Sequence, residues 1–152
     1  MPTITISKHF ECSPDIAFDV ISDFPNAPEY IGGIKDVQMI SDGPVAVGTK
    51  LKETRIMMGR EASEIMEVTV MDKPSTFVVE AFNHGTEYVT KYTVEPEGEG
   101  SKVTLVFSGT PKTFMAKVMA ALFSRMISTV ADLMEKEMID AAEEGKRRAT
   151  AN

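Results

Sequence analysis

The sequence predicts a single α+β domain in which a curved antiparallel sheet of about seven strands wraps a long C-terminal helix. Three observations favour this fold class. Runs with the two-residue period of strands alternate with turn residues over most of the chain, and a broad apolar helical face follows them. The length of 152 residues suits one hydrophobic core, so residues 1–152 are expected to form one domain.

The first 33 residues are expected to form one strand and two short helices. Residues 3–11 alternate apolar and polar side chains, which is typical of a half-buried strand. Ser13-Pro14 indicates a helix start, because serine caps the first turn and proline fits its first position. A second short helix is expected over residues 26–31, ending at Gly32-Gly33.

Six further strands are expected between residues 34 and 109, separated by turns rich in Gly, Pro, Asn and Asp. They lie at about 34–41, 48–57, 61–72, 76–84, 87–95 and 102–109. Because the connections between them are short, consecutive strands should form hairpins, and the sheet should therefore be antiparallel.

The long helix is expected to run from residue 111 to about residue 146. Apolar side chains recur along it at steps of three and four residues, at Met115, Met119, Leu122, Met126, Val130 and Leu133. A face this broad needs cover that the short helices cannot provide, so it should pack on the concave side of the sheet. Charged residues interrupt the region too often for a transmembrane segment.

Composition excludes several classes of function. The net charge of -7 repels phosphate backbones, so nucleic acid is not an expected partner. Cys12 is the only cysteine, which rules out an internal disulfide and fits a reducing compartment. The chain starts without a basic segment followed by an apolar run, so we expect a cytoplasmic protein.

Metal and cofactor chemistry has little support in the sequence. His9, His84 and Cys12 show no ligand spacing such as Cys-x-x-Cys or His-x-x-x-His. Phosphate-binding glycine loops, dinucleotide fingerprints and serine nucleophile elbows are also missing. No cofactor and no metal are therefore expected.

Several segments resemble the START-like superfamily, also called Bet v 1-like or SRPBCC, and within it the polyketide cyclase/dehydrase-like branch. The matching segments are Ser13-Pro14-Asp15-Ile16-Ala17-Phe18-Asp19-Val20, Pro28-Glu29-Tyr30, Ser41-Asp42-Gly43-Pro44, Val47-Gly48-Thr49-Lys50-Leu51, Lys52-Glu53-Thr54-Arg55, Tyr92-Thr93-Val94-Glu95-Pro96 and Gly98-Glu99-Gly100-Ser101-Lys102-Val103-Thr104. The resemblance implies the helix-grip fold, with a cavity between the sheet and the last helix. It does not imply one reaction, because lipid carriers, cyclases, hormone receptors and chaperone activators share this fold.

One departure concerns the second short helix. Many relatives carry an aromatic residue just after the position of Tyr30, whereas Ile31 and a glycine pair stand here. Because Gly32 and Gly33 relax backbone constraints, the mouth of the cavity is expected to be more open or more mobile.

Candidate site residues begin with the strand at 48–57. Its alternation places Leu51, Glu53, Arg55 and Met57 on one face, which we expect to point toward the helix and the cavity. Glu53 could act there as a general base, and Arg55 could stabilise a developing enolate oxygen. The alternative is a structural ion pair at the rim of the sheet.

Tyrosines and methionines complete the candidate site. Tyr88 and Tyr92 lie in phase and could line one wall, while Tyr30 could close the entrance. Met115, Met119, Leu122 and Met126 would line the cavity from the long helix, since methionine adapts to varied apolar ligands. The alternatives are tyrosines at the edge of the core and methionines that only fill it.

Three functions remain open. The first is binding of a small hydrophobic or amphipathic molecule, such as a lipid, polyketide or aromatic metabolite. The second is a cofactor-independent cyclase or dehydratase that uses Glu53, Arg55 and cavity tyrosines. The third is a partner-binding or weakly dimerising module that uses an exposed part of the region Phe114–Phe123.

Overall fold

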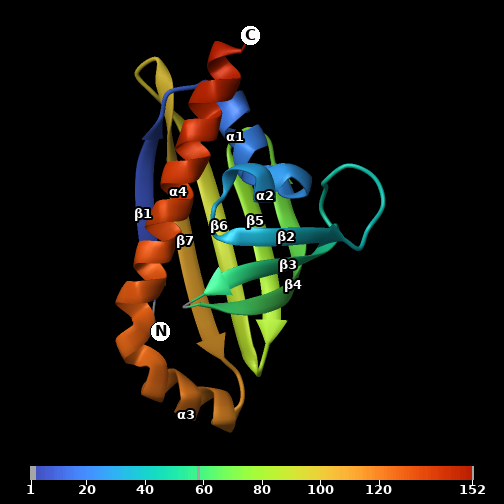
Figure 1. The fold of residues 1–152 in the computed structure, drawn as a ribbon, viewed down its shortest axis with the longest axis vertical. Helices are drawn as coiled ribbons and strands as arrows, with labels where there is room; N and C mark the ends of the chain where they lie inside the picture. Colours follow the sequence, from blue (N-terminus) through green and yellow to red (C-terminus); the bar gives the residue numbers. More distant parts are fainter. Residues whose placement is uncertain (1–2, 58, 152) are drawn as a thin grey trace.

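The computed structural model of the chain describes residues 3–57 and 59–151 (Figure 1). Seven strands form one antiparallel sheet in the order β1-β7-β6-β5-β4-β3-β2, which confirms the predicted α+β fold class. The strands are β1 (Thr3–Phe10), β2 (Ile34–Met39), β3 (Lys50–Met57), β4 (Arg60–Asp72), β5 (Thr76–Asn83), β6 (Thr86–Glu97) and β7 (Gly100–Pro111). The first strand of the chain, β1, pairs with the last, β7, so the N-terminal strand lies beside the strand that precedes the C-terminal helices.

The sheet is strongly curved. In Figure 1, β2 and β3 cross at a steep angle to the long strands β1, β7 and β6. The register between β4 and β5 shifts between Val68 and Val70, and that between β2 and β3 shifts between Ile34 and Asp36. Irregularities of this kind bend a strand and increase its twist, which gives the sheet a concave side.

Two short helices and one 3₁₀ turn follow β1, where the sequence predicted two short helices. They are α1 (Pro14–Ser22), η1 (Phe24–Asn26) and α2 (Ala27–Tyr30). The Ser13 side chain caps α1 by accepting a hydrogen bond from the Ile16 N–H at 3.3 Å. The buried face of α1 includes Phe18, whose ring meets that of Phe77 edge to face at 6.0 Å. This contact docks α1 onto β5.

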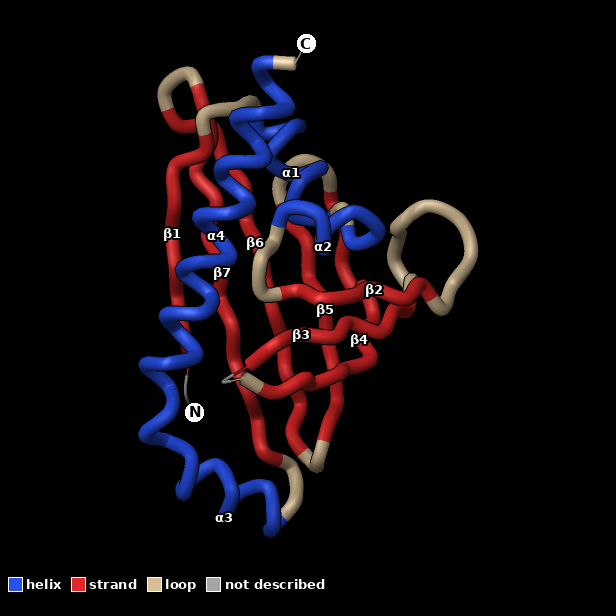
Figure 2. The backbone as a smooth tube through the Cα atoms, viewed as in Figure 1, coloured by secondary structure: helices blue, strands red, loops and turns tan. Residues whose placement is uncertain are grey.

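The prediction of one continuous helix from residue 111 was wrong in detail. The region contains α3 (Phe114–Phe123), the 3₁₀ turn η2 (Ser124–Met126) and α4 (Ile127–Thr150), and the two α-helices are bent by 84°. Figure 2 shows α4 running along the sheet, while α3 turns away below it. The apolar period continues through Ser124–Met126 without Pro or Gly, so periodicity alone does not reveal the bend.

The packed core lies between the concave side of the sheet, α1 and the C-terminal half of α4. Its fully buried side chains include Phe10, Phe18, Leu51, Phe77, Leu105 and Met138. Among the described residues, no single helix meets the length and hydropathy expected of a membrane span, although the bent pair α3 and α4 meets them when taken together.

Candidate functional site

A cavity of about 590 Å³ lies between the concave side of the sheet and α4, beside α1 and α2. Its volume falls within the range of small-molecule sites, which is roughly 300–1,000 Å³. Most of its lining is apolar and comes from both the sheet and α4, including Val79, Leu105, Phe107, Val130, Met134 and Met138. The described residues therefore enclose a space suited to an apolar molecule.

A partly buried ion-pair cluster of Glu53, Arg55 and Glu137, which we call the Arg55 cluster, lies on this cavity wall. Alternation along β3 turns Glu53 inward, where its side chain is 3% exposed. The Arg55 Nε donates a hydrogen bond to Glu53 Oε1, and the Arg55 Nη2 donates one to Glu137 Oε1 at 2.9 Å. Arg55 thereby links β3 to α4 through two ion pairs, which is a structural role. All three residues of the cluster also line the cavity.

Burial shifts the protonation of these groups. Burial raises the pKa of Glu53. The positive charge of Arg55 offsets part of this rise, the negative charge of Glu137 adds to it, and the net shift is upward. Burial also raises the pKa of the neighbouring Glu64 carboxyl, again opposed by Arg55. For Arg55, burial lowers the pKa but the charges of Glu137 and Glu53 outweigh it, so the net shift is upward and the guanidinium stays charged.

Two tyrosines of β6 face the same space. Tyr92 lies close to the Arg55 cluster, and burial followed by the charge of Glu137 raises the pKa of its hydroxyl. The Tyr88 ring stacks on Phe107, with centroids 5.8 Å apart and planes at 15°. Within the described part of the chain, no protein group forms a hydrogen bond with either hydroxyl, so both can serve a bound molecule.

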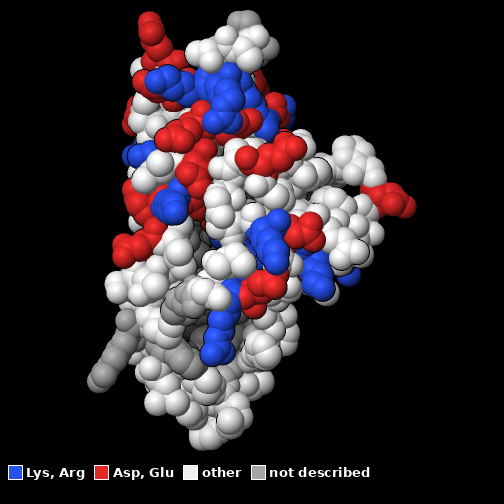
Figure 3. Space-filling model, in the orientation of Figure 1, with Lys and Arg blue, Asp and Glu red and all other residues white. Residues whose placement is uncertain are grey.

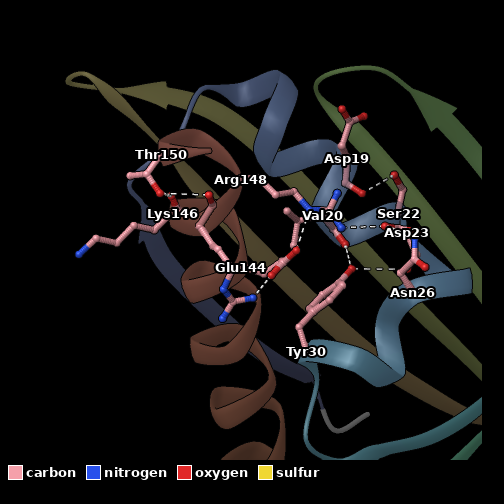
Figure 4. Close-up of polar contacts among 11 residues, drawn as sticks. Asp19, Val20, Ser22, Asp23, Asn26, Tyr30, Glu144, Lys146, Arg148 and Thr150 are labelled. Carbon is pink, nitrogen blue, oxygen red and sulfur yellow. Dashed lines mark hydrogen bonds and ion pairs between the residues drawn. The ribbon is translucent and has the colours of Figure 1, made fainter. Parts of the chain in front are cut away.

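Tyr30 also lines the cavity, but its hydroxyl is engaged. It donates to the Val20 carbonyl oxygen at 2.8 Å, near the end of α1 (Figure 4). The Arg148 guanidinium lies 5.5 Å from the Tyr30 ring centroid, and it is held by Asp23 at 2.7 Å and Glu144 at 2.9 Å. These contacts fix Tyr30 as part of the wall between α2 and α4.

The glycine pair after α2 is likewise attached to α4. The Gly32 N–H donates to Asp140 Oδ2 at 2.9 Å, and both glycines line the cavity. The expectation of a more open or mobile mouth rested on the freedom of these two residues. The hydrogen bond to Asp140 restrains the first of them.

The predicted site residues separate into two groups. Tyr30, Glu53, Arg55, Met57, Tyr88 and Tyr92 line the cavity together. Leu51 shares the inward face of β3, but it is fully buried in the packed core and is not part of the lining.

The predicted residues of the last helix do not reach the cavity. Met115, Met119, Leu122 and Met126 lie on α3 and η2, outside the lining. Because the chain bends at η2, the helical face on the cavity belongs to α4 instead and includes Val130, Leu133, Met134, Glu137, Met138 and Ala141.

Sequence reasoning also missed Glu137 and Glu64 as site residues. Glu137 carried a usable signal, because it lies three residues after Met134 and seven after Val130, on an otherwise apolar helical face. A carboxylate at such a position needs a charged or hydrogen-bonding partner, and Arg55 is that partner. Among the described residues, no three His, Cys, Asp or Glu side chains are grouped in a way that could hold a metal ion.

Comparison with solved structures finds the same fold at low sequence identity. The Thermus thermophilus protein TTHA0849 is 13% identical with a TM-score of 0.80, over 97% of this chain and 99% of that chain. A major latex-like protein from Panax ginseng is 11% identical with a TM-score of 0.73, over 95% and 97%. The di-domain ARO/CYC protein StfQ of the steffimycin biosynthetic pathway is 12% identical with a TM-score of 0.74, over 97% of this chain and 52% of that chain.

Sequence comparison adds the family. No curated protein matches the chain. A family model described as polyketide cyclase / dehydrase and lipid transport matches residues 1–138, nearly the whole chain. This match and the structural neighbours confirm the resemblance to the START-like or SRPBCC superfamily that the sequence segments indicated. The chain therefore belongs to the polyketide cyclase / dehydrase and lipid transport family.

Proposed function

We propose that the protein binds a small hydrophobic or amphipathic molecule, such as a lipid, polyketide or aromatic metabolite, between its sheet and α4. The observation that carries this proposal is the cavity of about 590 Å³, lined mainly by apolar side chains. The Arg55 cluster and the hydroxyls of Tyr88 and Tyr92 supply a few polar groups in this lining, which suits a ligand with one polar end. Membership of a family that includes lipid transport supports the same interpretation.

The experiment is to fill the cavity and measure binding of a neutral apolar probe. N-phenyl-1-naphthylamine should fluoresce on binding to the purified protein, because a dry apolar site enhances its emission. Leu133→Trp places a large ring in the lining and should weaken binding at least about tenfold. Ile139→Trp, at an exposed position of α4 outside the lining, is the matched control and should bind as the unaltered protein does.

Native mass spectrometry or solvent extraction of the purified protein should recover an apolar molecule. Equal probe binding by the Leu133→Trp and Ile139→Trp proteins would place the probe outside the cavity and would refute the proposal. Loss of binding in both variants would point to disturbed folding, which circular dichroism detects.

A second candidate function is cofactor-independent cyclisation or dehydration of a polyketide chain. The observation that favours it is the pairing of a buried carboxyl of raised pKa, Glu53, with a permanently charged Arg55 and the nearby hydroxyl of Tyr92. A base of raised pKa can take a proton from the carbon between two carbonyl groups at neutral pH. Arg55 and Tyr92 can stabilise the resulting enolate oxygen, whose carbon then attacks a second carbonyl.

This candidate predicts that Glu53→Gln abolishes turnover of a poly-β-carbonyl substrate while the protein stays folded and still binds N-phenyl-1-naphthylamine. Glu135→Gln, an exposed carboxylate on α4, is the control and should leave turnover unchanged. Unaltered turnover by the Glu53→Gln protein would exclude Glu53 as the base.

A further inference from the structure

The charges that line the cavity are unbalanced. Among the described residues, five carboxylates belong to the lining, at Asp23, Glu53, Glu64, Glu137 and Asp140, and two cations, at Arg55 and Lys136. Arg148 neutralises Asp23 at 2.7 Å from outside the lining, which still leaves an excess of negative charge. An anion that entered this space would meet net repulsion in a site of low dielectric constant.

The guanidinium of Arg55, whose side chain is 28% exposed, is already shared by two carboxylates. Arg55 donates to Glu53 and to Glu137, and the side chain of Glu137 is only 14% exposed. A ligand carboxylate could pair with Arg55 only by competing with one of them, which would leave that carboxylate buried without its cation. The pKa of Glu53 is raised, mainly by burial and in part by the charge of Glu137, which is consistent with two carboxylates that share one guanidinium.

A neutral or cationic polar group meets no such conflict. A hydroxyl or an ammonium can donate hydrogen bonds to the carboxylate oxygens of the Arg55 cluster. The hydroxyls of Tyr88 and Tyr92 can bond to a ligand oxygen or nitrogen as well. We propose that the cavity selects apolar molecules whose polar group is neutral or cationic, and that it rejects carboxylates such as fatty acids.

This selectivity rests on the proposed ligand-binding function, and one competition assay separates the two. Dodecanol, dodecylamine and dodecanoate share an alkyl chain and differ in head-group charge at neutral pH. Each is titrated against bound N-phenyl-1-naphthylamine below its micelle concentration. Dodecanol and dodecylamine should displace the probe at least about tenfold more effectively than dodecanoate.

Glu137→Gln removes one of the two competing carboxylates and should improve displacement by dodecanoate about tenfold. Glu135→Gln lies two residues away on an exposed position of α4 and makes the same change in net charge, so it should leave displacement by dodecanoate unchanged. A gain limited to Glu137→Gln would assign the rejection of carboxylates to the Arg55 cluster.

The outcomes are distinguishable. Dodecanoate that displaces the probe from the unaltered protein as well as dodecanol does would overturn the charge selectivity and leave ligand binding standing. An equal gain in both variants would assign the effect to net charge and would also overturn the proposal. Failure of the unaltered protein to bind the naphthylamine probe would overturn the ligand-binding function itself.

A second inference comes from the opposite end of the molecule, where α3 exposes its apolar side chains. The exposed fractions of Phe114, Met115 and Leu122 are 78%, 67% and 68%, and Ala116 is the buried contact of the helix with the body of the protein. In Figure 3, the described residues visible at the lower end of the face shown, where α3 lies in Figure 1, are white and so are neither Lys, Arg, Asp nor Glu. An exposed patch of this kind marks a surface that meets a partner or a membrane.

Charge distinguishes between these partners. Residues 113–131 hold Lys117 and Arg125 but none of the 23 acidic residues of a chain whose net charge is -7, whereas Lys112, just before them, pairs with Glu87 at 3.9 Å. Two copies that met through α3 by a twofold axis would bring like charges together. An anionic lipid surface is complementary to the basic residues and to the exposed apolar side chains of this region. The basic residues approach the lipid head groups, and the apolar side chains enter the membrane interface. We infer that α3 docks on the surface of an anionic bilayer.

Vesicle flotation tests this docking. The protein should float with vesicles of phosphatidylcholine and phosphatidylglycerol mixed at about 3:1 and at least about tenfold less with phosphatidylcholine alone, and added salt should weaken binding. Leu122→Glu should reduce binding at least about tenfold, whereas Val47→Glu, the same change at an exposed apolar residue of the loop between β2 and β3, should not.

Absence of flotation with the anionic vesicles would overturn the docking, and so would equal flotation of the two variants. Sedimentation velocity at several protein concentrations tests the other occupant of the surface. A dimer that Leu122→Glu dissociates, and Val47→Glu does not, would replace the bilayer with a second copy of the chain.

Discussion

The helices α3 and α4 come from one apolar run of the sequence and have opposite fates. α4 buries Met138 and Ala141, and these two residues line the cavity together with Val130 and Met134. α3 leaves most of its large apolar side chains in contact with solvent. The difference shows that apolar periodicity predicts a helix but does not say what, if anything, will cover its apolar face.

The polar residues of the two helices differ in the same way. Glu137 of α4 reaches across the cavity to Arg55 of β3, so a charged residue holds this helix to the sheet. Lys117 of α3 is exposed, and among the described residues it forms no ion pair like that between Glu137 and Arg55. Removing contacts of α4 should therefore affect the whole protein, whereas changes in α3 should stay local.

The largest expected effect comes from truncating one apolar side chain on each helix. Met138→Ala should lower the free energy of unfolding by about 2–5 kcal/mol, because it removes a fully buried side chain that packs in the core and also lines the cavity. Leu122→Ala on α3 should change it by less than about 0.5 kcal/mol, because Leu122 is exposed. Urea denaturation measures both, and similar losses would show that α3 is packed in solution.

A smaller effect is expected where α4 closely approaches the start of the chain. A Cβ atom on Gly145 would lie 2.9 Å from Cys12 Sγ and 3.3 Å from Phe10 Cδ2. Gly145→Ala should therefore cost about 1–3 kcal/mol of overpacking, partly offset by about 1 kcal/mol of helix propensity. Thr129→Ala, at an exposed position of α4, is the control and should slightly stabilise the protein. A stabilised Gly145→Ala protein would mean that α4 packs less tightly there.

The polar contact of α4 can be tested through pH. Because the folded-state pKa of Glu53 is raised above its ordinary value of 4.5, its contribution to stability is greatest below pH 4.5 and is lost as pH rises through the raised pKa. Glu53→Gln removes the titrating group, so the variant should not show this loss. The free energy of unfolding of the unaltered protein minus that of the variant should therefore fall as pH rises, by at most about 1.4 kcal/mol per pH unit. Urea denaturation between about pH 4 and pH 7 measures the difference.

Glu135→Gln serves as the control for this titration, because its carboxylate is exposed on the same helix as Glu137. Its stability should follow that of the unaltered protein across the pH range. The opposite slope for Glu53→Gln would show that the attraction of Arg55 outweighs the burial of Glu53.

The smallest effect is expected from removing the N-terminal cap of α3. Thr113 Oγ1 accepts a hydrogen bond from the Ala116 N–H at 3.1 Å, and losing such a cap costs about 1 kcal/mol. Thr113→Ala should speed hydrogen exchange of the α3 amides about fivefold and shift global unfolding by less than about 0.5 kcal/mol. Ser13→Ala removes the equivalent cap from α1, which packs on α4, so its cost should appear in global unfolding instead. Equal global losses in the two variants would contradict the peripheral position of α3.

Much of the fold could be predicted because it depends on local patterns. The alternation along β3 correctly placed Leu51 and Glu53 on the inward face, and Ser13-Pro14 correctly marked the start of α1. The candidate site could be predicted only on the strands and at Tyr30, because the two-residue period assigns each strand side chain to one face of the sheet. The residues expected from the helix were displaced by the bend at Ser124–Met126.

The sequence by itself determined the order of the strands and helices, the antiparallel sheet and the inward face of β3, because each depends on neighbouring residues. Only the tertiary structure decided that Glu137 pairs with Arg55 over a separation of 82 residues, and that the Tyr30 hydroxyl bonds to Val20. It also decided that α4 rather than α3 lines the cavity. The physical reason is that a helix or strand follows from local periodicity, whereas the partner of a buried charge depends on how distant segments approach one another.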